Sequence, residues 1–150
     1  MAFTEIKFLK YASDVVIAHK DFHFSNENIN ITPPAANGKL PLGAIVARAK
    51  GGVATAAYAV IDDAADIVDT NEFAIVFGDH HSFAYDFAPK AIAAGKWNAV
   101  GIVRDAAFKE FYIKENYATV LGATAYAKLK QLLAAQGLLV LQDVSDYKVA

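Results

Sequence analysis

The sequence predicts an α+β domain in which a helix near the C-terminal end leads through a glycine into a strand. The clearest evidence is the segment TAYAKLKQLLAAQGLLVL, residues 124–141. Thr124 suits the start of the helix, because its hydroxyl accepts a hydrogen bond from one of the first free N–H groups. Gly137 ends the helix, since glycine enters the left-handed conformation without a steric penalty. The residues Leu138–Leu141 are apolar at every position and predict a buried strand.

The predicted helix has one apolar face and one polar face, which is typical of a helix packed on a core. The apolar positions recur at spacings of four, three and one; they are Ala125, Leu129, Leu132 and Leu133. The polar positions on the other side are Lys128, Lys130 and Gln131. A helix that turns into a buried strand needs a sheet to receive that strand, and the rest of the chain supplies candidate strands.

Composition limits the class of protein. The 150 residues suffice for one domain, and 55% hydrophobic residues with a mean hydropathy of +0.26 argue against disorder. The net charge is −2, and no basic stripe with stacking aromatics occurs, so we expect no nucleic-acid partner. The absence of cysteine excludes disulfides and thiolate metal sites. No apolar run approaches the roughly 20 residues that cross a bilayer, and the N-terminal segment lacks a signal-peptide core. We therefore expect a protein made in a cytoplasm, without a membrane partner.

The first part of the chain differs from the rest, and we predict an N-terminal arm and linker over residues 1–41, followed by a domain over residues 42–150. Four of the ten phenylalanines lie in the first 24 residues. The sequence then turns polar and reaches Pro33-Pro34, which forbids a helix, and the turn signal Asn37-Gly38. The alternative is that the aromatic segment supplies the first strand of the domain, and Val15-Val16-Ile17 favours a strand.

Strands are predicted from residue 42 onward. The segments 42–50 and 53–61 read as a hairpin closed by Gly51-Gly52, because both central residues of a tight hairpin turn take positive φ. The acidic segment with Asp62, Asp63, Asp66 and Asp69 reads as a loop, and residues 72–77 read as the next strand.

The region after residue 78 gives three further predictions. Pro89 favours a short helical turn over residues 89–94. Residues 99–103 read as a central strand, in which Gly101 indicates a close backbone approach or a bulge. Residues 109–117 alternate aromatic and charged positions and predict an edge strand, whose lysines discourage further pairing.

A metal site is the most specific chemistry that the residue types suggest. Imidazole and carboxylate groups bind zinc and other divalent ions, and they gather at Asp79, His80, His81 and Asp86, with His19 and His23 elsewhere. Adjacent histidines in a strand point to opposite faces, however, so we favour a solvated loop and expect no metal.

No catalytic motif stands out, so we expect no enzyme activity and no cofactor. Carboxylates in a polar loop keep ordinary pKa values, which argues against acid–base catalysis by the acidic segment. Cysteine is absent, no serine lies in a nucleophile-elbow motif, and Gly51-Gly52 lacks the lysine of a phosphate loop. Trp97 is the single tryptophan and is typical of a core or subunit-interface anchor.

The order of the strand and helix motifs resembles the lambda-type head decoration proteins of tailed phages, which are capsid-stabilising trimers. The matching segments are LGAIVARAKGGVATAAYAVI, AVGIVRD and LKQLLAAQGLLVL, which together span about residues 42–141. The long aromatic arm and the stretch from Asp62 to Pro89 depart from that pattern.

The resemblance implies a small β-rich domain with hairpins, a partly open barrel-like sheet, and one main C-terminal helix followed by a strand. It implies a structural virion protein on the capsid surface, with the major capsid protein and further copies of itself as partners. The arm residues Phe3, Ile6, Phe8 and Tyr11 would contact the capsid, and Trp97 is the candidate residue for the trimer interface. Two alternatives stay open: another virion component, such as a tail or fibre-base protein, or a small metal-binding module centred on His80 and His81.

Overall fold

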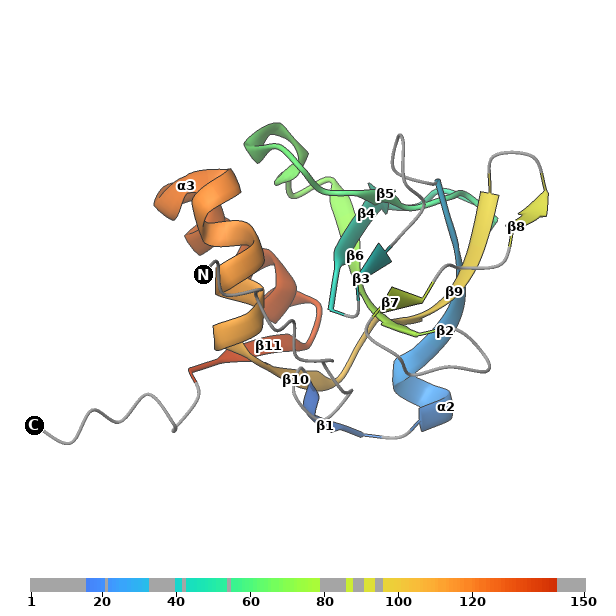
Figure 1. The fold of residues 1–150 in the computed structure, drawn as a ribbon, viewed down its shortest axis with the longest axis horizontal. Coiled ribbons are helices and arrows are strands. Elements are labelled where there is room, and N and C mark those ends of the chain that lie inside the picture. The colour runs from blue at the N-terminus through green and yellow to red at the C-terminus, as the bar shows by residue number, and fades with distance from the viewer. Residues whose placement is uncertain are drawn as a thin grey trace, which may run out of the picture.

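The computed structural model describes residues 16–20, 22–32, 40–41, 43–53, 55–78, 86–87, 91–93 and 96–142. Its elements in chain order are β1 (Val16–His19), α2 (Phe22–Ser25), β2 (Asn26–Ile31), β3 (Leu40–Pro41), β4 (Ile45–Ala49), β5 (Ala59–Val60), the 3-10 helix η1 (Ala64–Asp66), β6 (Asn71–Gly78), β7 (Asp86–Phe87), β8 (Ala91–Ala93), β9 (Lys96–Ile102), β10 (Ala106–Lys109), α3 (Glu110–Ala135) and β11 (Leu138–Leu141). The fold is α+β and rich in strands, as the sequence predicts (Figure 1).

The larger sheet curls into a barrel. Its strands follow the order β2-β9-β6-β4-β5, with β8 paired to β9, and all these pairs are antiparallel. A parallel bridge between Ile31 and Tyr58 brings the two ends of this order together. The Tyr58 N–H donates to the Asn30 carbonyl at 2.8 Å, and the Thr32 N–H donates to the Tyr58 carbonyl at 2.8 Å. These two bonds close one end of the barrel and confirm the barrel-like sheet.

The barrel has a core of its own, built from residues on one face of its strands. Ala44, Ala74 and Ala99 are small, so the larger isoleucine and valine side chains fill the narrow interior. The whole cluster consists of Ile29, Ile31, Ala44, Val46, Tyr58, Ala74, Val76 and Ala99. The opposite face of the same strands belongs to a second core that α3 covers.

Gly101 of β9 packs closely against the Ile29 side chain of β2, which confirms the predicted close approach to its backbone. A Cβ atom at this position would lie 2.5 Å from Ile29 Cδ1 and 3.1 Å from Ile29 Cγ1. We expect Gly101→Ala to lower the free energy of unfolding by about 1–3 kcal/mol, because the extra methyl overpacks a filled core. The measurement is urea unfolding. Shortening the opposing residue, Ile29→Val, in the same chain should recover part of the loss, whereas equal losses in the single and double variants would contradict the steric explanation.

Helix α3 is two helical segments joined by a sharp reversal. Gly122 has non-helical angles, φ 77° and ψ 160°. The Lys130 ammonium contacts the Glu110 carboxylate at 2.7 Å, although a straight helix would separate these residues by about 30 Å. The chain therefore doubles back at Gly122, and the second segment matches the predicted helix. The second helical segment therefore begins at the reversal at Gly122, two residues before its predicted start at Thr124.

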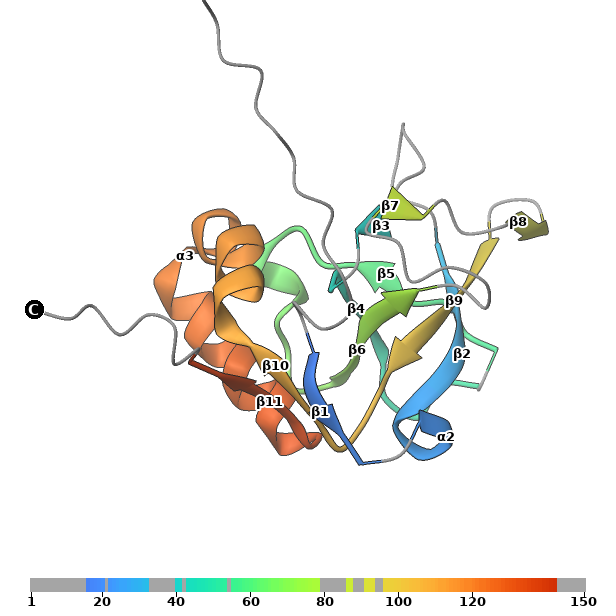
Figure 2. The ribbon, with the colours of Figure 1, turned by 60° about the horizontal axis from the view of Figure 1, so that its bottom comes forward.

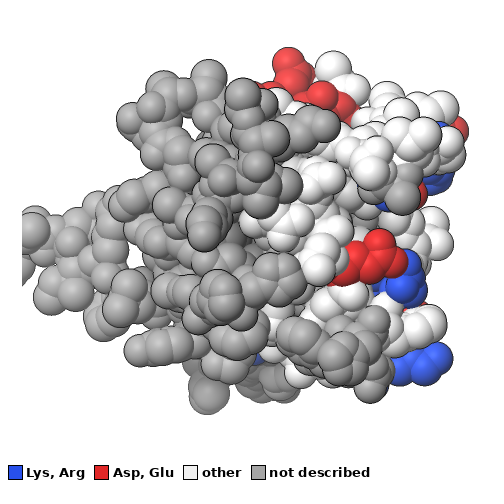
Figure 3. Space-filling model, turned by 90° about the vertical axis from the view of Figure 1, so that its right-hand side faces the viewer, with Lys and Arg blue, Asp and Glu red and all other residues white. Residues whose placement is uncertain are grey.

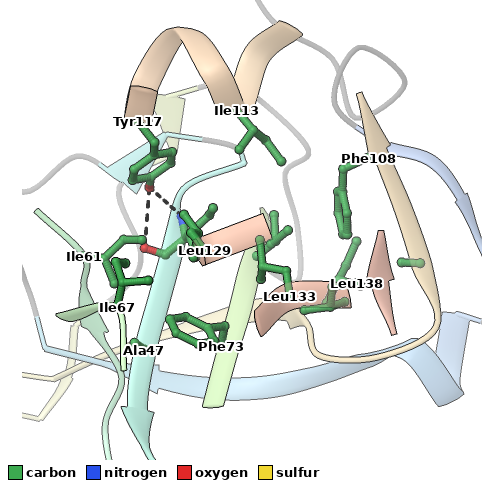
Figure 4. Packing of buried hydrophobic residues seen from close by; sticks show 14 of the residues in the cluster. Ala47, Ile61, Ile67, Phe73, Phe108, Ile113, Tyr117, Leu129, Leu133 and Leu138 are labelled. Atoms are coloured by element: carbon green, nitrogen blue, oxygen red, sulfur yellow. Dashed lines mark hydrogen bonds between the residues drawn. The ribbon is translucent and has the colours of Figure 1, made fainter. Parts of the chain in front are cut away.

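The three remaining main strands form a smaller sheet in the order β1-β10-β11. Strand β1 pairs antiparallel with β10, and β11 pairs parallel with β10 because α3 carries the chain back between them. Figure 4 shows the core between this sheet, α3 and the barrel, where Phe108, Leu129, Leu133 and Leu138 are fully buried. This small sheet (β1-β10-β11) is thus covered by α3 on its inner face.

Two side chains of α3 and its C-terminal turn bind the barrel through backbone groups. The Ile45 N–H donates to the Tyr117 hydroxyl at 2.6 Å, and that hydroxyl donates to the Ile45 carbonyl at 3.5 Å (Figure 4). Burial raises the pKa of Tyr117 to about 12. The Phe73 N–H donates to Gln136 Oε1 at 2.8 Å, and Gln136 Nε2 donates to the Phe73 carbonyl at 3.4 Å. These bonds fix the helical layer on the barrel.

The N-terminal boundary differs from the predicted one. Two strands, Val16–His19 and Asn26–Ile31, lie within the predicted arm and linker and belong to the two sheets: β1 pairs with β10, and β2 pairs with β9 over its whole length. Strands β1 and β2 agree with the alternative, in which this part of the chain supplies strands to the domain. Residues 1–15 lie outside the described residues.

The predicted edge strand over residues 109–117 is wrong, because only Lys109 belongs to a strand and α3 begins at Glu110. The alternating pattern concealed a helical one: Ile113, Tyr117 and Leu121 are buried at intervals of four. The predicted helical turn over residues 89–94 is also wrong in its described part, since Ala91–Ala93 form β8.

The predicted tight hairpin at Gly51-Gly52 is replaced by a longer loop. Strands β4 and β5 pair only through Val46 with Val60 and Ala47 with Ala59. Arg48 explains the loop: its Nη1 donates to the Ala56 carbonyl at 3.2 Å, and its guanidinium lies over the Tyr58 ring at 4.4 Å from the centroid. These contacts hold the loop against β4 and bring Tyr58 to the closing bridge.

Candidate functional site

The sequence-predicted site residues fall mostly outside the described residues. Those outside are the arm residues Phe3, Ile6, Phe8 and Tyr11, and the loop residues His80 and His81. The backbone of Trp97 lies in β9, opposite Ile31 of β2 and Ala91 of β8, but its side chain is outside the description. The same holds for the side chains of His19 in β1 and His23 in α2. These site assignments therefore stay predictions.

The acidic segment is a loop, as predicted, and the carboxylates of Asp63 and Asp66 accept backbone N–H groups of the same loop. Asp63 caps η1, where its Oδ1 accepts the Ala65 N–H at 3.0 Å. Asp66 Oδ2 accepts the N–H groups of Asp62 and Asp63, each at 3.3 Å. These groups are those of a capping box, which satisfies free helix N–H groups. Among the described residues, no group of three or more potential His, Cys, Asp or Glu ligands gathers to hold a metal ion.

The most distinctive surface in the described structure is the outer face of the small sheet, which points away from α3. Its exposed apolar side chains include Ile17, Leu139 and Leu141, with exposed fractions of 47%, 45% and 43%. Figure 2 shows β1, β10 and β11 in front of α3, with this face toward the viewer. The predicted burial of Leu138–Leu141 is therefore half right: Leu138 is fully buried, whereas Leu139 and Leu141 point outward.

We define the small-sheet face by the outward residues of the three strands. They are Ile17, Ala18, Ala107, Lys109, Leu139 and Leu141, so the charged Lys109, opposite Leu141, lies among apolar side chains. Strand pairing places Ala107 opposite Ala18 on one side and Leu139 on the other, so the residues form one continuous surface. The register of β1 shifts between Val16 and Ala18, a bulge that leaves Ile17 exposed. Scattered apolar residues are ordinary on protein surfaces, but a continuous apolar patch indicates a binding surface.

A hollow of about 450 Å³ lies at one end of the small-sheet face. The alanine and glycine residues of its lining leave space that larger side chains would fill, and Leu139 lies beside them. Its lining residues are Ala18, Lys20, Asp105, Ala106, Ala107, Gly137 and Leu139. The hollow is therefore apolar at its floor, with one cationic and one anionic residue in its lining.

The backbone around the hollow is fixed by hydrogen bonds and two left-handed residues. Asp105 has φ 47° and Gly137 has φ 80°. The Asp105 carbonyl accepts the Lys20 N–H at 3.0 Å and the Ser25 hydroxyl at 3.3 Å, while the Ala106 N–H donates to the Gly137 carbonyl at 3.1 Å. A Cβ atom on Gly137 would approach the Asp105 backbone nitrogen to 3.2 Å, so glycine is needed here. The backbone conformation therefore shapes the hollow, together with the side chains that line it.

Ion pairs join some of the described charged side chains away from the small-sheet face. Arg48 pairs with Glu72, and Arg104 pairs with Glu27 while its Nη1 donates to the Phe24 carbonyl at 2.8 Å. On the molecular side drawn in Figure 3, acidic and basic residues are interspersed among the described residues. An arrangement of this kind gives no extended field of one sign to steer a charged ligand.

Among the described residues, the groups with a shifted pKa are the tyrosines Tyr58, Tyr117 and Tyr126. Burial, and secondarily the Glu72 carboxylate, raise the pKa of Tyr58 to about 12. Burial and the Glu110 carboxylate raise the pKa of Tyr126 above its ordinary range. Each of these hydroxyls is held neutral in a structural contact, so their shifts indicate packing and not a poised acid or base.

Comparison with protein-family models, with characterised proteins and with solved structures finds no match to this chain. The described part of the chain contains no helix with the length and hydrophobicity to span a membrane. The small-sheet face is the functional candidate that sequence reasoning missed. The alternation of Leu138 inward and Leu139 outward could have indicated it, had the strand been taken as half-buried.

Proposed function

We propose that the protein is a structural virion protein that binds the outer surface of a phage capsid as a trimer and stabilises it. The order of motifs over residues 42–141 resembles the head decoration family, and the α+β, barrel-containing fold agrees with the fold that this resemblance implies. The observation that carries most weight is the small-sheet face, an exposed apolar surface suited to protein contact.

Capsid contact is assigned to the N-terminal segment before β1, with Phe3, Ile6, Phe8 and Tyr11 as the contacting residues. An aromatic and aliphatic segment can bind as an added strand, in which backbone bonds supply affinity and alternate side chains fill pockets. Many copies on one lattice would stabilise the shell, because a ligand that binds only the assembled state shifts the equilibrium by mass action. A ligand at a hundred times its dissociation constant contributes about 2.7 kcal/mol per site.

The test mixes the purified protein with capsids that lack it and follows co-sedimentation and capsid heat resistance. We expect the wild type to bind and to raise the temperature at which the capsids break open. Deleting residues 2–14 should abolish binding and leave the fold intact, because β1 begins at Val16 and keeps its pairing with β10. Circular dichroism and thermal unfolding check the fold of the deletion variant.

A matched pair of variants separates side-chain recognition from mere length. The first replaces the apolar residues of the segment by serine, namely Phe3, Ile6, Phe8 and Tyr11. The control replaces polar residues of the same segment by serine, namely Thr4, Lys7 and Lys10. We expect the first to lose capsid binding and the control to keep it. A wild type that binds no capsid of its source virus, or that sediments with tails, would overturn the proposal.

A further inference from the structure

We propose that Gly122 is the hinge of a segment exchange, in which two copies of this chain trade the second half of α3 together with β11. In the exchanged pair, α3 is one straight helix, and residues 123–141 of each copy pack on the body of the other. This inference goes beyond the proposed function and does not depend on it, because it concerns only how the domain folds.

The two halves of α3 are joined without a loop. Gly122 alone breaks the helical angles within Glu110–Ala135, with φ 77° and ψ 160°. This combination of angles is essentially restricted to glycine. A Cβ atom on Gly122 would meet no heavy atom within 4 Å, so the backbone conformation and not crowding is what requires glycine here. The reversal has no slack, and short hinges of this kind are those at which domains exchange.

The sequence of α3 is compatible with one continuous helix. Residues 110–135 contain no proline and a single glycine. A break in a helix leaves up to four N–H groups and four C=O groups without helical partners, and straightening at Gly122 would pair them. A straight helix of 26 residues is about 39 Å long, so it would carry its second half away from its own β10. That half would then need another copy to pack on.

A second copy offers the same partners that the second half of α3 contacts in its own chain. Strand β11 pairs with β10, and the Gln136 side chain binds both backbone groups of Phe73. Lys130 and Tyr126 contact the Glu110 carboxylate at 2.7 and 3.4 Å. Exchange keeps each of these contacts and changes only the hinge. The opposing cost is the lost freedom of two copies, which becomes smaller as the concentration rises.

The test uses a pair of introduced thiols, because the chain has no cysteine of its own. Lys109→Cys and Leu141→Cys place the thiols on opposite residues of β10 and β11. Adjacent strands lie about 4.8 Å apart, which falls within the Cα separation that a disulfide accepts. The hairpin form closes this disulfide within one chain, whereas the exchanged form closes it between two chains. A denaturing gel without reductant separates the two products, whatever other surface joins the copies.

The variant Gly122→Ala should shift the equilibrium toward exchange. Alanine is strained at the angles of the hinge, and it is a better helix former than glycine, so both effects favour the straight helix. We expect a shift of at least about thirtyfold per chain, and of about a thousandfold in the dimerisation constant, because each exchanged pair contains two hinges. The measurement is the fraction of disulfide between chains after unfolding in urea, refolding at a series of protein concentrations and oxidation.

Gly51 provides the matched control for this variant. It also has a positive φ, 71°, and a Cβ atom there would likewise meet nothing within 4 Å. It lies in the loop after β4, where no continuous helix is available as an alternative. Gly51→Ala should therefore lower stability in urea while the disulfide still forms within one chain.

A longer hinge should reverse the effect. Inserting Gly-Ser-Gly between residues 122 and 123 gives the reversal slack and interrupts the straight helix. We expect this insertion to return the disulfide of the Gly122→Ala chain to the form within one chain. In the chain with glycine at 122, refolding at millimolar concentration should give some disulfide between chains, and the insertion should remove it.

Three outcomes would overturn the inference. A folded Gly122→Ala chain whose disulfide stays within one chain at every concentration would show that the hinge does not open. Equal fractions of disulfide between chains in Gly122→Ala and Gly51→Ala would attribute the exchange to general instability. If Gly122→Ala does not fold, equal fractions with and without the insertion in the chain with glycine at 122 would exclude residue 122 as the hinge.

Discussion

Truncating Leu133 to alanine is expected to lower the free energy of unfolding by about 2–5 kcal/mol. Leu133 has no exposed surface and lies between the second segment of α3 and the core that α3 shares with the barrel and the small sheet (Figure 4). Its removal leaves a cavity that the surrounding strands can fill only in part, which adds to the lost burial of the side chain. Urea unfolding with an unchanged slope would show that the loss lies in the stability of the native state.

The neighbouring Leu132 is the matched control for this prediction. It undergoes the same chemical change, but it is only half-buried at the margin of the core. We therefore expect Leu132→Ala to cost less than Leu133→Ala. Losses below about 0.5 kcal/mol at both positions would mean that the apolar face of the helix is assigned to the wrong residues.

The spacing of apolar residues predicted those elements that a single continuous segment of the sequence determines. The second half of α3, the glycine that follows it and β11 agree with the apolar spacing of Leu129 and Leu133 and with Gly137 at φ 80°. The strand over residues 72–77 and the central strand over 99–103 correspond to β6 and β9. Gly101 was informative because a missing side chain in a strand has few explanations besides close contact.

Predictions failed where two periods competed or where distant contacts decided the structure. Residues 109–117 alternate in polarity, but burial of Ile113 and Tyr117 on the barrel selected the helical period. The loop after β4 looked like a tight turn, and the contacts of Arg48 with Ala56 and Tyr58 give it another course. Such tertiary contacts override local propensity, and a single sequence does not show which residues will meet.

The small-sheet face could not be predicted for a related reason. Its strands come from opposite ends of the chain, and the outward direction of Leu139 follows from the side on which α3 packs. Four consecutive apolar residues are typical of a strand buried on both faces. Only the arrangement of β1, β10 and β11 shows that one face of this strand stays exposed.

Stability is expected to fall steeply in alkali, beginning near pH 10. Burial raises the pKa of Tyr58 and of Tyr117 to about 12, from an ordinary value of 10.0. In the unfolded chain both hydroxyls lose their protons near pH 10, while in the folded chain they keep them. The unfolded state then binds fewer protons, so the free energy of unfolding decreases as the pH rises from 10 toward 12. For the fully buried Tyr117, two pKa units correspond to about 3 kcal/mol.

The variant Tyr117→Phe isolates one of these two contributions. At neutral pH it should cost about 1–3 kcal/mol, because the Ile45 N–H loses the acceptor that now lies 2.6 Å away inside the core. Above pH 10 the variant should lose less further stability than the wild type, since the titrating group is gone. The measurement is the free energy of unfolding by urea at a series of pH values from about 8 to about 11.5.

The difference between the two chains at each pH removes the contributions of lysines and of Tyr58, which both chains share. We expect this difference to be constant below pH 10 and to shrink above it, because only the wild type still has to keep the Tyr117 hydroxyl protonated. A difference that stays constant through pH 11.5 would show that Tyr117 ionises alike in the folded and unfolded chains. The hydroxyl would then be in contact with water, and the bond that ties α3 to β4 would not hold as described.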